Sequence, residues 1–214
     1  MTDAIILHAS LQLPLSCPPW QDTLLQALAY ARRLELERRD ATARRASLVG
    51  LGLVLLAAAM STRQAFPPRA FKFPASGKPA LSGGPRFSIS HSPARVACVV
   101  CPDTDCGIDI EDLPAAADAA AVTKLQRWTA TEAALKAAGL GLRAASRVEL
   151  ADSFDVAFIG DERYELQPLT ALPGVIGHLA ARKTLTPSIE LVELDDARLS
   201  ALLERSLGLA AQFE

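Results

Sequence analysis

The stretch Cys106-Gly107-Ile108-Asp109-Ile110-Glu111 has the pattern of an extended strand. Residues two apart in a strand share a face, so Asp109 and Glu111 point one way while Ile108 and Ile110 point the other. Two carboxylates about 4 Å apart, at an effective dielectric of about 20, repel each other by about 4 kcal/mol. The stretch therefore predicts a strand with a buried apolar face, whose acidic face either lies at an exposed edge or holds a cation.

A helix is predicted downstream, over residues 119–138, with Gly139 as its C-terminal stop. Glu132 lies on this helix and joins Asp109 and Glu111 as a third candidate carboxylate. Oxygen ligands of this kind are those that hard divalent cations prefer.

The same helix carries Lys136 four residues after Glu132. A Glu–Lys pair at this spacing is usually a solvated contact worth a few tenths of a kcal/mol. In a helical projection, however, the pair shares one stripe with Leu125, Trp128 and Leu135, which we expect to be the packing face. A charge pair on a packing face is a candidate functional site.

The remaining pattern predicts an α+β protein with strands and helices in two consecutive groups. Strands are expected at residues 4–13, 86–90, 95–101, 107–111, 153–159, 163–168, 174–182 and 188–194, the last four as an antiparallel series. Helices are expected at residues 22–37, from about 44–47 to 60, and at 119–138 and 196–207, with a long loop over 66–85. His8 falls on the face of the first strand that we expect to be exposed.

Composition excludes several classes of protein. Half of the 214 residues are hydrophobic and 21% are charged, which argues against disorder. Residues 1–100 carry 12 Lys/Arg against 5 Asp/Glu, whereas residues 101–214 carry 10 against 19. This asymmetry suits a ligand that is both anionic and metal-chelating, although scattered surface charge explains it equally well. It does not indicate a nucleic-acid partner.

The cysteines and the most apolar segment both indicate a cytoplasmic protein without a membrane anchor. Four cysteines in a chain of this size do not form a secreted disulfide framework, and Cys98 and Cys101 fall on opposite faces of a predicted strand. We expect buried, reduced thiols. The apolar run at 48–60 is shorter than the roughly 20 residues that span a bilayer, so it predicts a buried helix.

Two upstream segments carry groups that bind phosphate oxygens. Ser76-Gly77-Lys78-Pro79 places a lysine in the long loop, and Ser88-Ile89-Ser90-His91-Ser92 places hydroxyls and an imidazole at the end of a strand. Each segment alone is a common structural feature.

In chain order, Gly-Lys-Pro, Ser-Ile-Ser-His-Ser, Gly-Ile-Asp-Ile-Glu and Trp-Thr-Ala-Thr-Glu-Ala-Ala-Leu-Lys resemble the motifs of the phosphopantetheinyl transferase superfamily, specifically its surfactin-synthetase-activating type. The motifs extend over residues 77–141. The resemblance implies two pseudo-symmetric α/β subdomains, each an antiparallel sheet packed on a long helix, at residues 1–102 and 103–214. It also implies a monomer.

The activity implied by the resemblance is the Mg²⁺-dependent transfer of the phosphopantetheine arm of coenzyme A to a serine of an acyl or peptidyl carrier protein. The reaction releases 3′,5′-adenosine bisphosphate. Such carriers serve fatty-acid, polyketide and non-ribosomal peptide biosynthesis, and the sequence does not distinguish among them.

Residue roles also follow from the resemblance. Asp109, Glu111 and Glu132 would hold Mg²⁺, and Glu132 would act as general base. Lys136 would contact the phosphate under attack.

The coenzyme A contacts would come from the first half of the chain. His91, Ser90 and Pro79 match family positions that bind coenzyme A, His91 at a phosphate and Ser90 near the pyrophosphate. Lys78 and Arg45, rather than Arg44, would hold the adenosine 3′-phosphate.

Two positions depart from the family pattern. Thr131 stands where many relatives carry lysine, and Ser88 stands where asparagine is common. Neither is an expected metal ligand, so activity should survive. A non-catalytic relative that binds coenzyme A or a carrier protein, and an unrelated Mg²⁺-dependent phosphohydrolase, remain as alternatives.

Overall fold

The computed structural model describes residues 4–11, 19–74, 78–170, 172, 174–183, 192–194 and 196–206. The helices are α1 (Pro19–Ala27), α2 (Tyr30–Glu37), α3 (Ala41–Thr62), α4 (Ala119–Ala138) and α5 (Asp196–Ser206), with short 3₁₀ turns at Pro68–Ala70 and Leu142–Arg147. The strands are β1 (Ile5–Ser10), β2 (Phe71–Lys72), β3 (Ala80–Leu81), β4 (Arg86–His91), β5 (Arg95–Cys101), β6 (Cys106–Asp112), β7 (Val148–Leu150), β8 (Val156–Ile159), β9 (Glu162–Pro168), β10 (Val175–Ala181) and β11 (Val192–Leu194).

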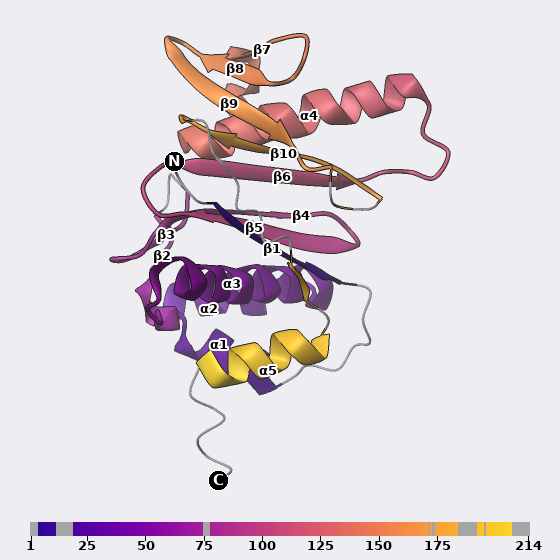
Figure 1. The fold of residues 1–214 in the computed structure, drawn as a ribbon. Helices are drawn as coiled ribbons and strands as arrows, with labels where there is room; N and C mark the ends of the chain where they lie inside the picture. The colour runs from indigo at the N-terminus through magenta and orange to yellow at the C-terminus, as the bar shows by residue number, and fades with distance from the viewer. Residues whose placement is uncertain are drawn as a thin grey trace.

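Two sheets stack face to face, and each carries one long helix on its outer side (Figure 1). The first sheet has the strand order β11-β1-β5-β4 and is covered by α3, with α1 and α5 beyond it. The second has the order β6-β10-β9-β8-β7 and is covered by α4. This arrangement confirms the α+β prediction.

Alternation along β1 and β5 explains why the sheets stack. Leu7 and Ala9 join the core beneath α3, whereas Ala4 and Ile6 join a second core between the sheets. Because both faces of β1 are covered, the prediction that His8 is exposed is wrong: its side chain is buried. Cys98 and Cys101 enter these two different cores as reduced thiols, as predicted, whereas Cys17 lies outside the described residues.

The C-terminal end of the chain returns to the first sheet. Strand β11 pairs in parallel with β1, with Leu7 opposite Val192. The prediction that residues 188–194 continue an antiparallel series is therefore wrong for Val192–Leu194, and residues 188–191 lie outside the described part. Helix α5 follows and places Leu199 and Leu203 in the core under α3.

Two predicted helices differ from the structure in their bounds. The helix expected at 22–37 is two helices, because Ala29 has an extended backbone (φ −56°, ψ 139°). Helix α3 begins at Ala41 rather than near 44–47, because the side chain of Asp40 accepts a hydrogen bond from Ala43 N at 2.9 Å.

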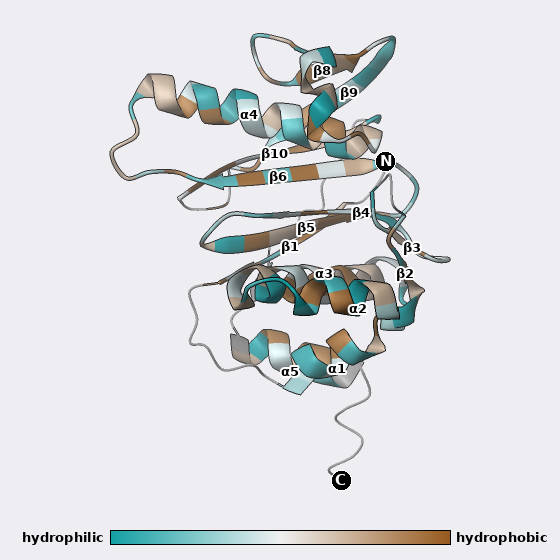
Figure 2. Cartoon of the chain, turned by 180° about the vertical axis from the view of Figure 1, so that it is seen from behind, coloured by the Kyte–Doolittle hydropathy of each residue, from teal (hydrophilic) through white to brown (hydrophobic). Residues whose placement is uncertain are grey.

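Helix α3 is long and apolar enough to span a membrane by length and composition alone. In this fold it is a core helix, with 67% of its most apolar segment buried. Figure 2 shows brown, apolar residues along both α3 and the strands that it covers.

The packing face of α4 matches the predicted stripe only in part. Leu135 is buried as predicted, but Trp128 is 41% exposed, and the other buried residues include Ala130, Ala133, Ala134 and Ala137. The reason is Gly107 on β6, where an added Cβ would lie 1.9 Å from the carbonyl oxygen of Ala133. Backbone packs directly on backbone here, so only small side chains fit on the α4 face. Glu132 and Lys136 are consequently half-buried beside this face rather than at its centre.

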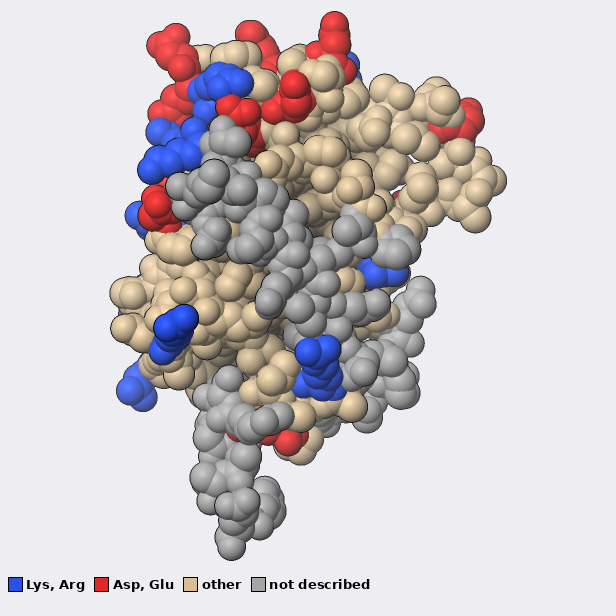
Figure 3. Space-filling view, viewed as in Figure 1, with Lys and Arg blue, Asp and Glu red and all other residues tan. Residues whose placement is uncertain are grey.

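Charge is distributed unevenly on the face shown in Figure 3. Acidic side chains gather over the upper part, which belongs to the second sheet and α4, with basic side chains at its left edge. The acidic second half of the sequence thus remains spatially distinct on this face.

Candidate functional site

Lys136 lies at the centre of the predicted acidic site. Its Nζ is 2.6 Å from Asp109 Oδ1 and 3.8 Å from Glu132 Oε2. It also donates to the carbonyl oxygen of Ile108 at 3.1 Å. Close packing of α4 on β6 at Gly107 makes this reach possible, because the lysine extends from the helix directly onto the strand.

Asp109 is the most deeply buried of the three acids, with 3% of its surface exposed. Its Oδ1 accepts hydrogen bonds from Ser90 Oγ at 2.7 Å and from Lys136 Nζ. Its Oδ2 is also buried, and it has no hydrogen-bond partner among the residues that the structure describes. A buried carboxylate oxygen without a partner is costly unless something binds it.

The other two acids are perturbed by the same neighbours. Burial and, after it, the charge of Asp109 raise the pKa of Glu132 and of Glu111 above the ordinary value. Lys136 opposes the shift in both, and Trp128 Nε1 opposes it in Glu111 by donating to Glu111 Oε1 at 3.2 Å. Strand β6 and helix α4 therefore bring all three predicted carboxylates within electrostatic range of one another.

A preformed metal cage is not seen. Within the described ranges, no group of three or more His, Cys, Asp or Glu side chains is arranged to hold a metal ion. Lys136 instead supplies the positive charge beside Asp109. Mg²⁺ commonly binds through one or two carboxylates plus substrate phosphates and water, so the partnerless Oδ2 of Asp109 and the two acids beside it fit that mode of binding.

A cleft runs past Lys136 toward the loop before β3. Two adjoining pockets of ≈170 and ≈200 Å³ share Lys78, Pro79, Phe87 and Gly139 in their walls, and Lys136 lines the second. The structure thus brings the predicted phosphate-binding residues Lys78 and Pro79 to the same cleft as the predicted catalytic lysine.

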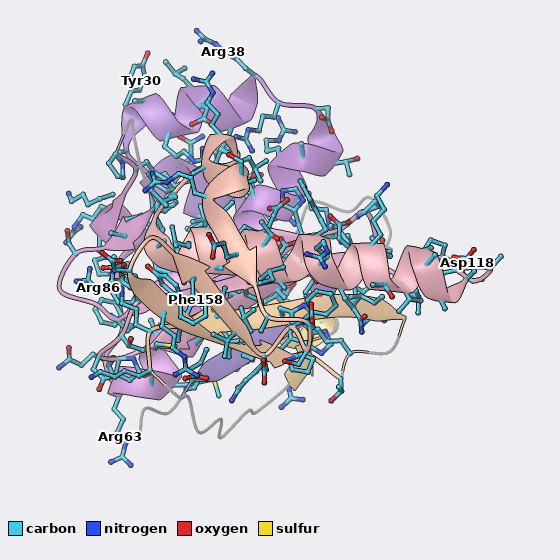
Figure 4. All side chains as sticks on the ribbon, turned by 90° about the horizontal axis from the view of Figure 1, so that it is seen from above. Tyr30, Arg38, Arg63, Arg86, Asp118 and Phe158 are labelled. Carbon is cyan, nitrogen blue, oxygen red and sulfur yellow. The ribbon has the colours of Figure 1, made fainter. Side chains whose placement is uncertain are left out.

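The cleft walls are largely apolar, and three of their four charged side chains, Lys78, Arg86 and Lys136, are cationic. Lys78 Nζ donates to the carbonyl oxygen of Cys106, and burial lowers the pKa of Lys78. Arg86 lines the first pocket and lies 3.7 Å from Asp105 Oδ1. Figure 4 shows Arg86 at the opposite side of the molecule from Asp118, which caps the N-terminal end of α4. Three cations around a cleft of this size suit an anionic ligand.

Neither a family model nor a curated protein matches this chain. The geometry of the site and the order of the motifs therefore carry the functional argument.

Three residues predicted to bind coenzyme A do not line the two pockets of the cleft: Ser90, His91 and Arg45. Ser90 is buried and its hydroxyl already bonds Asp109 Oδ1 and Ile110 N. His91 is exposed at the end of β4, and Arg45 is half-buried near the start of α3. Neither lines the two pockets, so their roles stay predictions.

Sequence reasoning missed two groups of residues. The sequence pattern predicted Arg86 only as the start of a strand, although a cation two residues before the Ser-Ile-Ser-His-Ser segment was a usable signal. Ser92 and Asp112 were also missed: Ser92 Oγ donates to Asp112 Oδ1 at 2.7 Å. The sequence offered only one indication of this contact: the serines at and just after β4 (Ser88, Ser90 and Ser92) recur every two residues, as do same-face residues of β6.

A separate, more open groove of ≈550 Å³ lies along the N-terminal half of α4. Its apolar walls include Leu125 and Trp128, and Lys124 and Arg127 border it. Thr131 also lines this groove, and its hydroxyl donates to the carbonyl oxygen of Arg127 at 2.8 Å. Trp128 connects the groove to Glu111 through its indole hydrogen bond.

Proposed function

We propose that this protein transfers the phosphopantetheine arm of coenzyme A to a serine of a carrier protein. The observation that carries the proposal is Lys136, which contacts Asp109, lies one helical turn from Glu132 and also lines the cationic cleft. This arrangement joins an acidic site to an anion-binding site at one lysine. A pyrophosphate ester suits both, because its oxygens would bind lysine, and the acids would hold a metal ion that neutralises its charge.

Lys78, Arg86 and Lys136 are the residues proposed to hold the phosphates of coenzyme A in the cleft. Pro79 shapes the wall beside Lys78. His91 and Arg45 are kept as proposed contacts to phosphates that extend beyond the cleft.

Asp109, Glu111 and Glu132 are the proposed ligands of Mg²⁺. When bound, this ion supplies charge neutralisation and orientation for the pyrophosphate. The partnerless Oδ2 of Asp109 supports this assignment.

The chemical step is a displacement at phosphorus. The carrier serine oxygen forms a bond to the phosphorus that bears the pantetheine arm, and the bridging P–O bond breaks. The bonding electrons leave with 3′,5′-adenosine bisphosphate, whose developing negative charge the cations of the cleft stabilise.

Glu132 accepts the serine proton in this scheme. Its pKa, raised by burial and by the charge of Asp109, makes it a stronger base than an ordinary glutamate. Lys136 holds the phosphate under attack, because its ammonium group is placed between the acids and the cleft.

The groove beside α4 is the proposed docking surface for the carrier. It adjoins the acidic site through Trp128 and Glu111, and its lysine and arginine suit an acidic helix that follows the carrier serine. A carrier bound in this groove would bring its serine to Glu132 along α4, while coenzyme A occupies the cleft.

The two halves are proposed to be pseudo-symmetric subdomains. Each has a largely antiparallel sheet covered by one long helix, α3 in one and α4 in the other. In space, β11 and α5 accompany the first of them.

Product analysis tests the proposal against its alternatives. The protein is incubated with coenzyme A and Mg²⁺, with and without a panel of carrier proteins that lack the arm. Release of 3′,5′-adenosine bisphosphate only in the presence of a carrier supports transfer. Hydrolysis without any carrier indicates a phosphohydrolase, and binding without products indicates a non-catalytic relative.

A further inference from the structure

The two sheets meet along a row of buried serines. Strand β4, an edge strand of the first sheet, carries Ser88 and Ser90, and Ser92 follows it directly. These three serines lie at alternate positions, and each is at most 4% exposed. Strand β6 is an edge of the second sheet, so its outer backbone groups have no neighbouring strand there. Polar groups buried at such an edge need side-chain partners.

The serines provide these partners in register. Ser88 Oγ accepts from Ile108 N and Ser90 Oγ accepts from Ile110 N, each at 3.2 Å. Ser92 Oγ donates to Asp112 Oδ1 at 2.7 Å, and Asp112 Oδ2 accepts from Ala94 N at 3.1 Å. We call Ser88, Ser90 and Ser92 the serine seam.

Ser90 makes one contact that Ser88 does not. While it accepts from the backbone of β6, its hydroxyl donates to Asp109 Oδ1 at 2.7 Å. The hydroxyl hydrogen is directed at the acid, because a carboxylate oxygen can only accept, while Ile110 N–H occupies one of the lone pairs of the hydroxyl oxygen. Lys136 donates to the same oxygen.

Two donors on Oδ1 fix which way the Asp109 carboxylate faces. They leave Oδ2 as the oxygen without a partner among the described residues. Loss of a group that orients a metal ligand in this way typically weakens metal binding by about 10–100-fold.

We infer that Ser90 is a positioning residue that orients Asp109, so that Oδ2 is presented to a divalent cation, rather than a residue that contacts phosphate. The inference rests on the proposed function for the identity of the cation site. It also couples the site to the fold, since the hydroxyl that orients Asp109 belongs to the seam that joins the sheets.

Manganese binding tests the inference without measuring activity. Mn²⁺ affinity is measured by electron paramagnetic resonance, in the presence of coenzyme A, for the wild type, Ser90→Ala and Ser88→Ala. Both variants lose one acceptor for an edge amide of β6, but only Ser90→Ala loses the contact to Asp109. We expect Ser90→Ala to bind Mn²⁺ at least about 10-fold more weakly and Ser88→Ala to stay within about 2-fold of the wild type.

Equal Mn²⁺ affinities in Ser90→Ala and the wild type, or equal losses in the two variants, would overturn the inference. If Ser90→Ala does not fold, Ser90→Cys keeps the side-chain size with a much weaker donor, and the same loss is expected. Absence of Mn²⁺ binding by the wild type would overturn both the inference and the proposed metal site. Mn²⁺ binding that weakens as expected, in a protein that transfers nothing, would contradict the proposed function alone.

Discussion

Lys136 compensates the charge of an acid that is almost completely buried. Replacing it by methionine removes that charge but keeps most of the side-chain volume. Removing one partner of a buried ion pair costs about 3–5 kcal/mol, and since 28% of the Lys136 side chain is exposed we expect a smaller loss of about 2 kcal/mol in the free energy of unfolding. Urea denaturation of the metal-free protein measures it.

The double variant Lys136→Met/Asp109→Asn provides the control. It removes both charges, so much of the lost stability should return. Equal stability of Lys136→Met and the wild type would show that Asp109 does not depend on this lysine.

Glu132 is the residue on which the proposed proton transfer depends. Glu132→Gln keeps its size and removes the base, so transfer should fall at least about 100-fold while thermal stability stays near that of the wild type. Glu149→Gln, an exposed change on β7, is the matched control and should leave the rate unchanged. A Glu132→Gln variant with near-normal turnover would refute the assigned role.

His178 predicts how stability depends on pH. It is buried on β10, opposite Asp109 on β6, and its Nδ1 lies 2.8 Å from Thr129 Oγ1. Burial lowers its pKa from 6.5 to about 4. The unfolded chain therefore binds a proton that the folded chain rejects, and stability is lost as pH falls from about 6.5 toward 4, by about 3 kcal/mol in all.

Denaturation at a series of pH values, for the wild type and His178→Gln, measures this contribution. The difference in stability between the two proteins should shrink as pH falls through that window. A difference that does not change with pH would contradict the burial of a neutral imidazole.

Gly107 sets the distance between α4 and β6. An added Cβ would lie 1.9 Å from the carbonyl oxygen of Ala133 and 2.6 Å from Ala137 N, and neither backbone atom can move without shifting the helix. We expect Gly107→Ala to destabilise the protein by about 3 kcal/mol, at the upper end of ordinary overpacking. It should also weaken Mg²⁺ binding, because Lys136 and Glu132 would move away from Asp109.

Gly141→Ala is the matched control for this substitution. Gly141 has an extended backbone (φ −88°), and an added Cβ would meet nothing within 4 Å. Its stability should change by less than about 0.5 kcal/mol. Thermal denaturation of both variants is sufficient, and equal melting temperatures would contradict the close packing of α4.

The elements show which parts of the fold could be predicted. The alternation along β6 correctly placed Ile108 and Ile110 in the core and Asp109 and Glu111 on the other face, because a two-residue period is local information. The packing face of α4 was predicted correctly at Leu135 and wrongly at Trp128, because the buried alanines depend on Gly107 on another element. Side-chain size alone favours Trp128 and Leu125 over alanine as packing residues.

The candidate site could be predicted where its residues lie in local sequence motifs, and not where it depends on contacts between distant elements. The three acids, Lys136, Lys78 and Pro79 come together as their motifs indicated. The serine seam could not be foreseen, since its hydroxyls look like ordinary strand positions until β4 and β6 are placed side by side.

At the scale of the whole molecule, β11 and α5 near the C-terminus pack against β1 and α1 near the N-terminus. Strand β11 pairs with β1, and Trp20 Nε1 of α1 donates to Ser200 Oγ of α5 at 3.1 Å. The parallel pairing of β1 with β11 joins residues almost a chain length apart, so no local pattern predicts it. His8 is buried because the face of β1 on which it lies, with Ala4 and Ile6, packs in the core between the two sheets.

The arrangement of the two sheets places the proposed cleft and the proposed docking groove on either side of the acids of β6 and α4. A carrier serine that reaches Glu132 would therefore meet the pyrophosphate held by Lys136 and Lys78. In the proposed reaction, residues from both halves of the molecule would therefore act together.

The mass of an intact carrier protein is the most direct measurement of this transfer. A carrier without the arm is incubated with the protein, coenzyme A and Mg²⁺, beside a control carrier whose acceptor serine is replaced by alanine. We predict that the first gains the mass of one phosphopantetheine arm and that the control gains nothing. If no carrier in a panel of fatty-acid, polyketide and peptide carriers gains that mass, while Mg²⁺ and coenzyme A are present in excess, the proposed function is contradicted.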